Sequence, residues 1–135
     1  ELGIAYVAYS PLSRGLLTGR IRSEGDLDAD DWRRQVPRFQ GANLAHNVAL
    51  LEPLERMAAQ KGSTPAAVAV AWILAKGDDI VPLVGMGRVS NVDRALEALA
   101  VDLSAGDVAA LDAAFPPGVA AGTRYPERMM GVLGI

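Results

Sequence analysis

The chain has 135 residues, half of them hydrophobic, which predicts one folded domain with a real core and excludes a disordered chain. Sixteen acidic and 13 basic residues give a net charge of −3, too small an imbalance to attract nucleic acid or an anionic membrane by charge alone. Because the chain has no cysteine, it forms no disulfide, which fits the cytoplasm as its compartment. Its longest apolar-leaning stretch, residues 64–76, is shorter than the ~20 residues that cross a bilayer, so we expect no membrane association.

The first expected element is a short strand. Residues 4–9 are rich in β-forming side chains and lie between Gly3 and Pro11, a pattern typical of a buried parallel strand. The strand ends in an aromatic ring, a hydroxyl and a proline, and Arg14 follows beside a glycine. Such a group of residues at the end of a strand indicates a surface that faces a ligand.

A long segment without a sustained hydrophobic period follows, from residue 10 to residue 43. Residues 30–35 could hold one helical turn, and a loop of this length inside a compact domain is usually functional. Trp32 and Phe39 could line a substrate pocket or attach the loop to the rest of the fold. Of these two roles, we favour attachment of the loop to the rest of the fold.

Two helices are expected next. Asn43 can cap a helix that runs to about residue 61 and stops at Gly62. Thr64 and Pro65 then begin a second helix that runs to about residue 76. The single histidine, His46, has no partner at metal-ligand spacing and is interpreted as a surface residue without a role.

A second strand and two more helices complete the pattern. Residues 80–84 form a short apolar run that ends in a glycine-rich stretch, residues 85–88. Ser90 with Asp93 resembles a capping box for a helix to about residue 99, and Ser104 with Asp107 repeats the pattern. Strands separated by helices predict right-handed crossovers and a parallel sheet.

Two parallel strands leave both sheet edges open, whereas a closed (β/α)8 barrel takes eight strands. The sequence therefore predicts an α/β fold that is part of a TIM-type (β/α)8 barrel, with about two parallel strands and four or more helices. Residues 1–135 are expected to form a single, incomplete domain.

Five stretches in the same order carry a resemblance to a known family. They are Ala8–Leu12, Pro37–Gly41, Thr64–Ala66 with Ala71–Trp72, Asp78–Pro82, and Ala113–Pro126. Together they make the chain similar to the C-terminal portion of the aldo-keto reductases, which are barrels that hold a nicotinamide dinucleotide. The resemblance covers strands seven and eight of the family's barrel and its terminal helices.

The resemblance implies NADP as the cofactor and a role for individual residues. Tyr9 matches the aromatic residue that stacks on the nicotinamide, and Ser10 and Leu12 match strand-end positions that hold the pyrophosphate. Arg14 is either a further phosphate contact or a surface charge. The stretch after the second strand matches the residues that bind the adenosine 2′-phosphate. The candidate cofactor-binding residues are Tyr9, Ser10, Pro11, Leu12, Arg14, Gly85, Met86, Gly87 and Arg88.

One position departs from the family pattern. Arg94 and Ala95 stand where the resemblance places a glutamate and an asparagine near the adenine. The preference for NADP over NAD therefore stays open.

The resemblance also places the family's catalytic aspartate, tyrosine, lysine and histidine on earlier strands. None of Tyr6, Tyr9, Tyr125 and His46 stands in a matching context, so no catalytic residue is assigned and we expect the chain alone to be inactive. The expected function is the NADP(H)-binding part of an aldo-keto reductase that reduces aldehydes or ketones, with a small carbonyl substrate if an N-terminal portion completes the site. The alternatives are a non-catalytic cofactor-binding or interaction module that forms a homo-oligomer through its open strand edges, and an inert remnant.

Overall fold

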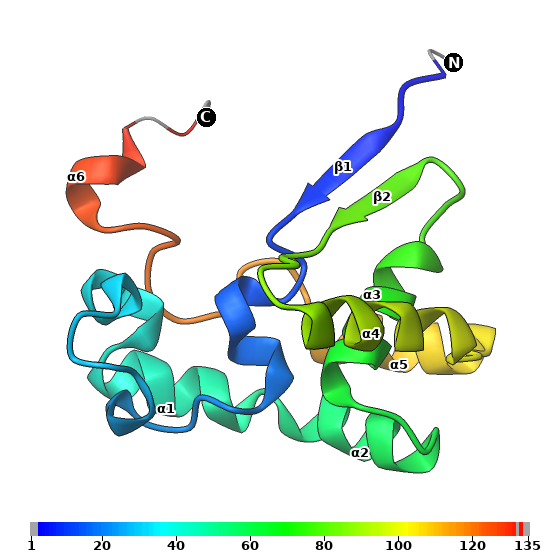
Figure 1. Cartoon of the computed structure of the whole chain (residues 1–135), viewed down its shortest axis with the longest axis horizontal. Coiled ribbons are helices and arrows are strands. Elements are labelled where there is room, and N and C mark those ends of the chain that lie inside the picture. Colours follow the sequence, from blue (N-terminus) through cyan, green and yellow to red (C-terminus); the bar gives the residue numbers. More distant parts are fainter. Residues whose placement is uncertain (1–2, 132, 134–135) are drawn as a thin grey trace.

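The computed structural model describes residues 3–131 and residue 133 (Figure 1). Two strands, β1 (Tyr6–Tyr9) and β2 (Ile80–Leu83), form one parallel sheet. The α-helices are α1 (Gly41–Ala49), α2 (Glu52–Gln60), α3 (Pro65–Leu74), α4 (Val89–Glu97), α5 (Ala105–Ala114) and α6 (Glu127–Met130). The short 3-10 helices are η1 (Ser13–Thr18), η2 (Glu24–Asp26), η3 (Trp32–Gln35), η4 (Pro37–Phe39) and η5 (Ala98–Ala100). The predicted α/β class, with two parallel strands and at least four helices, is confirmed.

The register of the sheet brings the two strand ends together. Tyr6 pairs with Ile80 and Tyr9 pairs with Leu83. The strands run in the same direction because the loop and α1 to α3 carry the chain back between them (Figure 1). The segments that follow β1 and β2 therefore start side by side, as the carboxyl ends of parallel strands do.

The prediction that the first strand is buried is wrong. The side chain of Tyr6 is 65% exposed and that of Tyr9 is 64% exposed, and alternate residues of β2 are exposed as well. Parallel strands are buried only where other layers cover both faces of their sheet. Among the described residues, α3 lies against β2, but the side chains of β1 stay largely exposed.

The core lies among the helices and within the long segment after β1. One cluster is contributed by α2, α3 and α5, and a second by the segment from η1 to α1. The members of the second cluster are Leu16, Ile21, Leu27, Val36, Phe39 and Leu44. The segment between β1 and α1 is therefore a packed unit with four 3-10 helices, one of which, η3, falls within the predicted helical turn. Phe39 is fully buried and attaches the segment, as we favoured, whereas Trp32 is 45% exposed.

The single helix predicted from Asn43 to about residue 61 is two helices, α1 and α2. Pro53 explains the break, because it has no N–H to donate to the carbonyl of Ala49 and is tolerated only in the first turn of a new helix. Asn43 is not the cap either. Helix α1 begins two residues earlier, and Asn43 Nδ2 donates to the carbonyl of Pro37 at 3.1 Å.

Of the three other predicted caps, two are confirmed and one is wrong. The hydroxyl of Thr64 accepts from the N–H of Ala67 at the start of α3. Ser104 and Asp107 form the expected capping box of α5. Helix α4 begins at Val89, so Ser90 already lies inside its first turn, and no side chain caps this helix.

The capping box of α5 should make stability depend on pH. The ammonium of Lys61 and the hydroxyl of Ser104 lower the pKa of Asp107 to about 2. Because this pKa lies below that of the unfolded chain, the contribution of Asp107 to stability is present above about pH 4 and disappears as pH falls toward 2. We expect the urea midpoint of Asp107→Asn to change less between pH 5 and pH 2 than that of the unsubstituted chain. Asp102→Asn removes an exposed carboxylate as a control, and equal pH profiles for the two variants would contradict the expectation.

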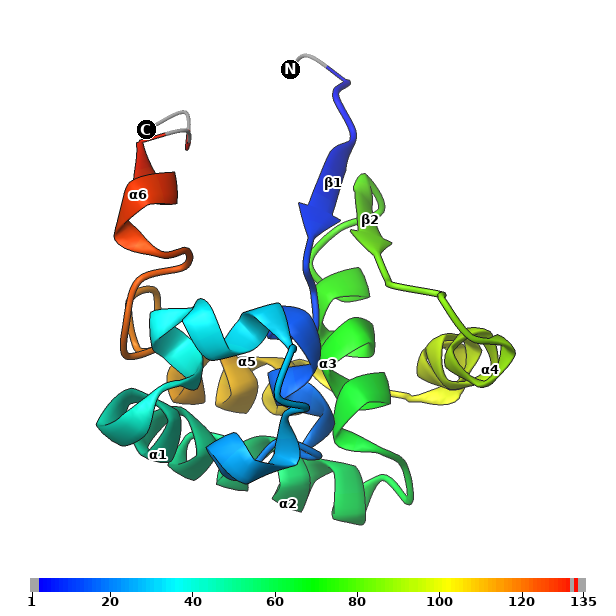
Figure 2. The ribbon, with the colours of Figure 1, turned by 60° about the vertical axis from the view of Figure 1, so that its left-hand side comes forward.

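The C-terminal tail packs back onto α1. Asn47, which is buried, donates from Nδ2 to the carbonyls of Arg38 (3.0 Å) and Ala121 (2.9 Å), and its Oδ1 accepts from the N–H of Ala121 (2.8 Å). His46 Nε2 lies 3.1 Å from the carbonyl of Val119. The tail is thus held on α1 and then continues to α6, which lies apart from the two strands (Figures 1 and 2).

Two glycines of this tail offer a matched test of its packing. Gly118 and Gly122 both have positive φ, at +84° and +80°, so alanine is strained at both positions. A Cβ on Gly118 would meet nothing within 4 Å, whereas one on Gly122 would lie 2.9 Å from the carbonyl carbon of Pro37. We expect Gly118→Ala to lower the free energy of unfolding by about 1 kcal/mol and Gly122→Ala by about 2–4 kcal/mol. Urea unfolding of both variants measures the difference, and equal losses would show that the tail does not pack here.

Among the residues that the structure describes, no helix combines the length and the apolar character needed to cross a membrane.

Candidate functional site

A cavity of about 710 Å³ lies where both strands end, and we call it the strand-end cavity. Its walls come from the ends of β1 and β2, from η1 and the residues around it, from the start of α3 and from α4. The predicted site residues Tyr9, Ser10, Pro11, Leu12, Arg14 and Gly85 line it. Met86, Gly87 and Arg88 are not among its lining residues. The structure thus brings the β1 candidates together with only the first of the β2 candidates.

The backbone after β1 adopts an uncommon conformation. Ser10, Ser13 and Arg14 have φ of 55°, 48° and 56°, in the left-handed region that side chains other than glycine seldom occupy. Hydrogen bonds from Ser13 N to Ser10 O and from Gly15 N to Leu12 O hold this turn, each at 2.9 Å. Each such residue costs ~1–3 kcal/mol, and residues of this kind cluster at ligand sites.

Arg14 connects this turn to the C-terminal tail. Its guanidinium lies 4.4 Å from the ring centre of Tyr125 and 5.1 Å from that of Trp32, and Nη1 donates to the carbonyl of Arg124 at 2.8 Å. Within the ranges that the structure describes, its Nη2 is buried and has no hydrogen-bond partner. Arg14 is therefore a structural connection as well as part of the cavity wall.

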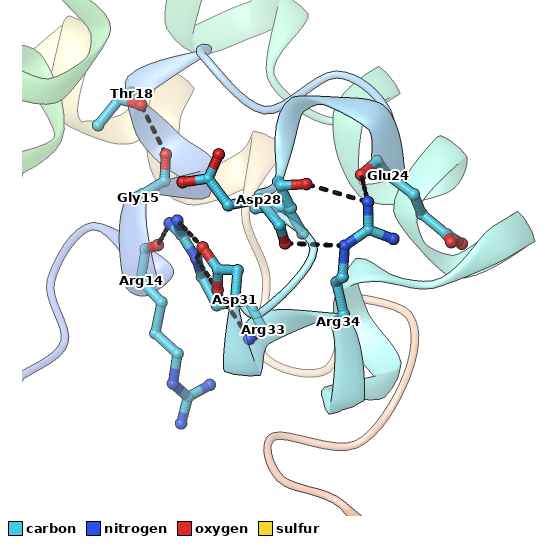
Figure 3. Close-up of polar contacts among 9 residues, drawn as sticks. Arg14, Gly15, Thr18, Glu24, Asp28, Asp31, Arg33 and Arg34 are labelled. Carbon is cyan, nitrogen blue, oxygen red and sulfur yellow. Dashed lines mark hydrogen bonds and ion pairs between the residues drawn. The ribbon is translucent and has the colours of Figure 1, made fainter.

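The backbone of Arg14 is held separately from its side chain. Arg33 donates to the carbonyl of Arg14 at 2.9 Å and forms an ion pair with Asp31, while the guanidinium of Arg14 extends away from them (Figure 3). The hydrogen bonds and charge of Arg33 lower the pKa of Asp31, so this carboxylate stays ionised. A second cavity, of about 520 Å³, lies on this side of Arg14. In the described part of the chain no group of acidic or histidine side chains could hold a metal ion.

Tyr125 brings a second phenol to the strand end. The neighbouring hydroxyl of Tyr9 and then the guanidinium of Arg14 lower the pKa of Tyr125 below its usual value. Tyr9 lines the strand-end cavity, so the tail reaches the rim of the candidate site. Sequence reasoning used this part of the tail only as a match to the family and assigned Tyr125 no role.

The wall formed by α4 and other parts of the lining contain residues that the sequence did not single out for the site. Asn91 and Arg94 come from α4, Thr64 comes from the N-terminus of α3, and Arg20 follows η1. Arg94 was noted only as a departure from the family pattern. The spacing of Asn91 and Arg94, three residues apart and hence on one side of a helix, is the signal that could have found this wall.

The cavity lies at the carboxyl ends of two parallel strands. This arrangement is typical of the class of α/β proteins, in which ligands bind at this edge of the sheet. A solved structure supports the barrel type: a glycerol dehydrogenase from Gluconobacter oxydans superposes with a TM-score of 0.70 at 30% identity, over 80% of this chain and 33% of its own. The chain therefore has the predicted partial barrel fold. The model of the aldo/keto reductase family matches residues 1–115, and the chain belongs to this family.

Two curated relatives match most of this chain. The aldo-keto reductase yakc of Schizosaccharomyces pombe, whose name includes NADP(+), is 39% identical over 126 residues, and a probable aldo-keto reductase 1 of Glycine max is 41% identical over 125 residues. Each match covers 93% of this chain, which spans 37% and 36% of the lengths of these relatives. The chain thus corresponds to little more than a third of such a protein.

Proposed function

We propose that this chain forms the NADP(H)-binding side of an aldo-keto reductase that reduces aldehydes or ketones. The observation that carries the proposal is the strand-end cavity, which joins the aromatic and polar end of β1 to the end of β2 and to α4. The family membership and the name of the yeast relative support NADP as the cofactor.

The residues of the cavity fit a dinucleotide. A cavity of about 710 Å³ lies within the range of ligand sites, which is about 300–1,000 Å³. The ring of Tyr9 offers a flat apolar surface for a nicotinamide. The hydroxyl of Ser10 and the guanidiniums that line the cavity can pair with phosphate oxygens.

NADPH would supply the hydride for reduction of a carbonyl group. The part of this chain is to bind and orient the dinucleotide. Tyr9 supports the nicotinamide, and Ser10 and Leu12 hold the pyrophosphate. The contacts of Arg14 with Trp32 and Tyr125 stabilise the conformation of this strand end. The substrate is a small carbonyl compound, and the proton donor is contributed by other strands, so the chain alone is inactive. The lack of cysteine also favours the cytoplasm.

Titration of the purified 135-residue chain with NADPH, followed by nicotinamide fluorescence, tests the proposal. We expect saturable binding with one NADPH per chain and no reduction of an aldehyde by the chain alone. Absence of binding by a chain that unfolds cooperatively would refute the proposal.

A second candidate function, a self-associating module, is favoured by the exposure of the sheet. Ile4, Tyr6 and Val7 from the first strand region and Val81 and Leu83 from β2 are large apolar side chains with more than half of their surface exposed. Apolar side chains at an open sheet are commonly covered by another chain. Sedimentation of the chain distinguishes the two candidates: a stable dimer supports self-association, and a monomer that binds NADPH excludes it as the main function.

A further inference from the structure

Three arginines lie close together where the C-terminal tail meets the turn after β1. They are Arg14 in that turn, Arg38 in η4 and Arg124 in the tail, and we call them the arginine cluster. Nη1 of Arg14 donates to the carbonyl of Arg124 at 2.8 Å, and Nε of Arg38 donates to the carbonyl of Gly122 at 3.3 Å. Segments far apart in the sequence thus bring three positive charges to one place.

No acidic side chain neutralises the arginine cluster. Among residues 3–131 and 133, none of its members forms an ion pair, and Nη2 of Arg14 is buried without a hydrogen-bond partner. Burial, and then the charges of Arg124 and Arg14, lower the pKa of Arg38. Positive charges that are close enough to disfavour one another are stabilised when an anion binds among them.

The aspartates of the second cavity do not take the place of such an anion. Asp31 is already paired with Arg33. Asp28 and Asp30 are exposed to solvent. The guanidinium of Arg14 extends away from Asp28 and Asp31 (Figure 3). The positive charge of the arginine cluster is therefore available to a ligand.

The arginine cluster lies beside the position proposed for the nicotinamide. The guanidinium of Arg14 lies 4.4 Å from the ring centre of Tyr125. The hydroxyl of Tyr9, and then the charges of Arg14 and Arg124, lower the pKa of Tyr125, so its phenol lies close to all three residues. Because Tyr9 is the proposed stacking partner of the nicotinamide, a carbonyl compound that reacts at this ring can reach the arginine cluster.

We propose that the arginine cluster binds an acidic group of the carbonyl substrate, a carboxylate or a phosphate. The substrates are thus aldehydes or ketones that carry a negative charge. This inference rests on the proposed function and names the substrate class of the same site. A guanidinium can pair with two oxygens of such a group, whereas a neutral substrate offers no charge to pair with.

The members of the arginine cluster contribute in different ways. Within the described part of the chain, the side chain of Arg124 and both Nη atoms of Arg38 donate no hydrogen bond, so they contact the acidic group directly. The guanidinium of Arg14 is held between Trp32 and Tyr125 and adds positive charge beside them.

Binding of three aldehydes of similar shape to the 135-residue chain tests the inference. They are 4-carboxybenzaldehyde, 4-formylphenyl phosphate and the neutral methyl 4-formylbenzoate. Isothermal titration calorimetry with the chain saturated with NADP+, which prevents reduction, gives each Kd. We expect at least one of the two acids to bind at least about tenfold more tightly than the ester, because hydrogen bonds between charged groups are strong. Added salt should reduce this preference, and comparison of the two acids tells carboxylate from phosphate.

Substitutions locate the binding of the acidic group. Arg124→Gln and Arg38→Gln should each weaken the acids by about threefold to tenfold and leave the ester nearly unchanged. Arg38→Lys keeps the charge and should restore part of the preference. Arg56→Gln removes the same charge from α2, where Arg56 pairs with Glu52, and should leave all three affinities unchanged. Thermal unfolding shows that each variant is folded.

Two results would overturn the inference. One is equal affinity of the unsubstituted chain for the acids and the ester. The other is an equal effect of Arg56→Gln and Arg124→Gln on the binding of the acids. In either case the unsubstituted chain would still bind NADP+, so the proposed function would stand, whereas failure of the unsubstituted chain to bind NADP+ and NADPH would refute both.

Discussion

Replacement of Asn47 with aspartate should lower the free energy of unfolding by about 2–4 kcal/mol. The amide nitrogen of Asn47 donates to the carbonyls of Arg38 and Ala121, and an aspartate oxygen cannot donate to either when ionised. Two carbonyls would then face a carboxylate in a buried place, and each unsatisfied group costs about 1–3 kcal/mol. The loss is large because one side chain connects α1, the segment before it and the tail.

Urea unfolding followed by circular dichroism measures this loss. His46→Ala is a suitable control, since His46 is the neighbouring residue on α1, is exposed and makes one contact with the tail, to Val119. We expect His46→Ala to lower the free energy of unfolding by no more than about 1 kcal/mol. If Asn47→Asp were no less stable than His46→Ala, the tail would not be held as described.

Replacement of Tyr9 with alanine should weaken NADPH binding about fivefold to a hundredfold. Stacking of a base on an aromatic side chain contributes about 1–3 kcal/mol, which corresponds to this range. The change removes no buried contact of the core, because the side chain is exposed, so stability should be nearly unaffected. Tyr9→Phe keeps the ring and should keep most of the affinity.

The same strand provides the control for this experiment. Tyr6 is also a tyrosine of β1 with an exposed side chain, but it does not line the strand-end cavity. Fluorescence titration of Tyr6→Ala should therefore give an affinity close to that of the unsubstituted chain. Equal weakening by the two alanine variants would mean that Tyr9 has no specific contact with the nicotinamide.

Local patterns in the sequence determined much of the fold. Apolar β-forming runs bounded by glycine or proline located both strands, and the Thr64–Pro65 and Ser104–Asp107 signals located the starts of α3 and α5. These signals are reliable because a strand end or a helix cap depends on neighbouring residues in the chain. The order of the elements was then enough to predict parallel pairing and part of a barrel.

Pro53 shows that a hydrophobic period does not by itself define a helix. Pro53 breaks the predicted helix into α1 and α2, and it was visible in the sequence. The apolar pattern continues across the break, although α1 packs in the cluster of the segment after β1 and α2 packs in the cluster with α3 and α5. Periodicity alone therefore overestimated the length of the helix.

Only the tertiary structure decided which side chains meet. Asn47 is a buried connection to the tail, the guanidinium of Arg14 lies between Trp32 and Tyr125, and Arg94 rather than Arg88 lines the strand-end cavity. Likewise, the β-prone residues of β1 are exposed although their composition is typical of a buried strand. The sequence by itself determined the elements and their order, because these follow from short-range sterics and hydrogen bonding. The burial and the direction of a side chain depend on packing between segments that lie up to about a hundred residues apart, such as those of Arg14 and Arg124. No local pattern in the sequence encodes this packing.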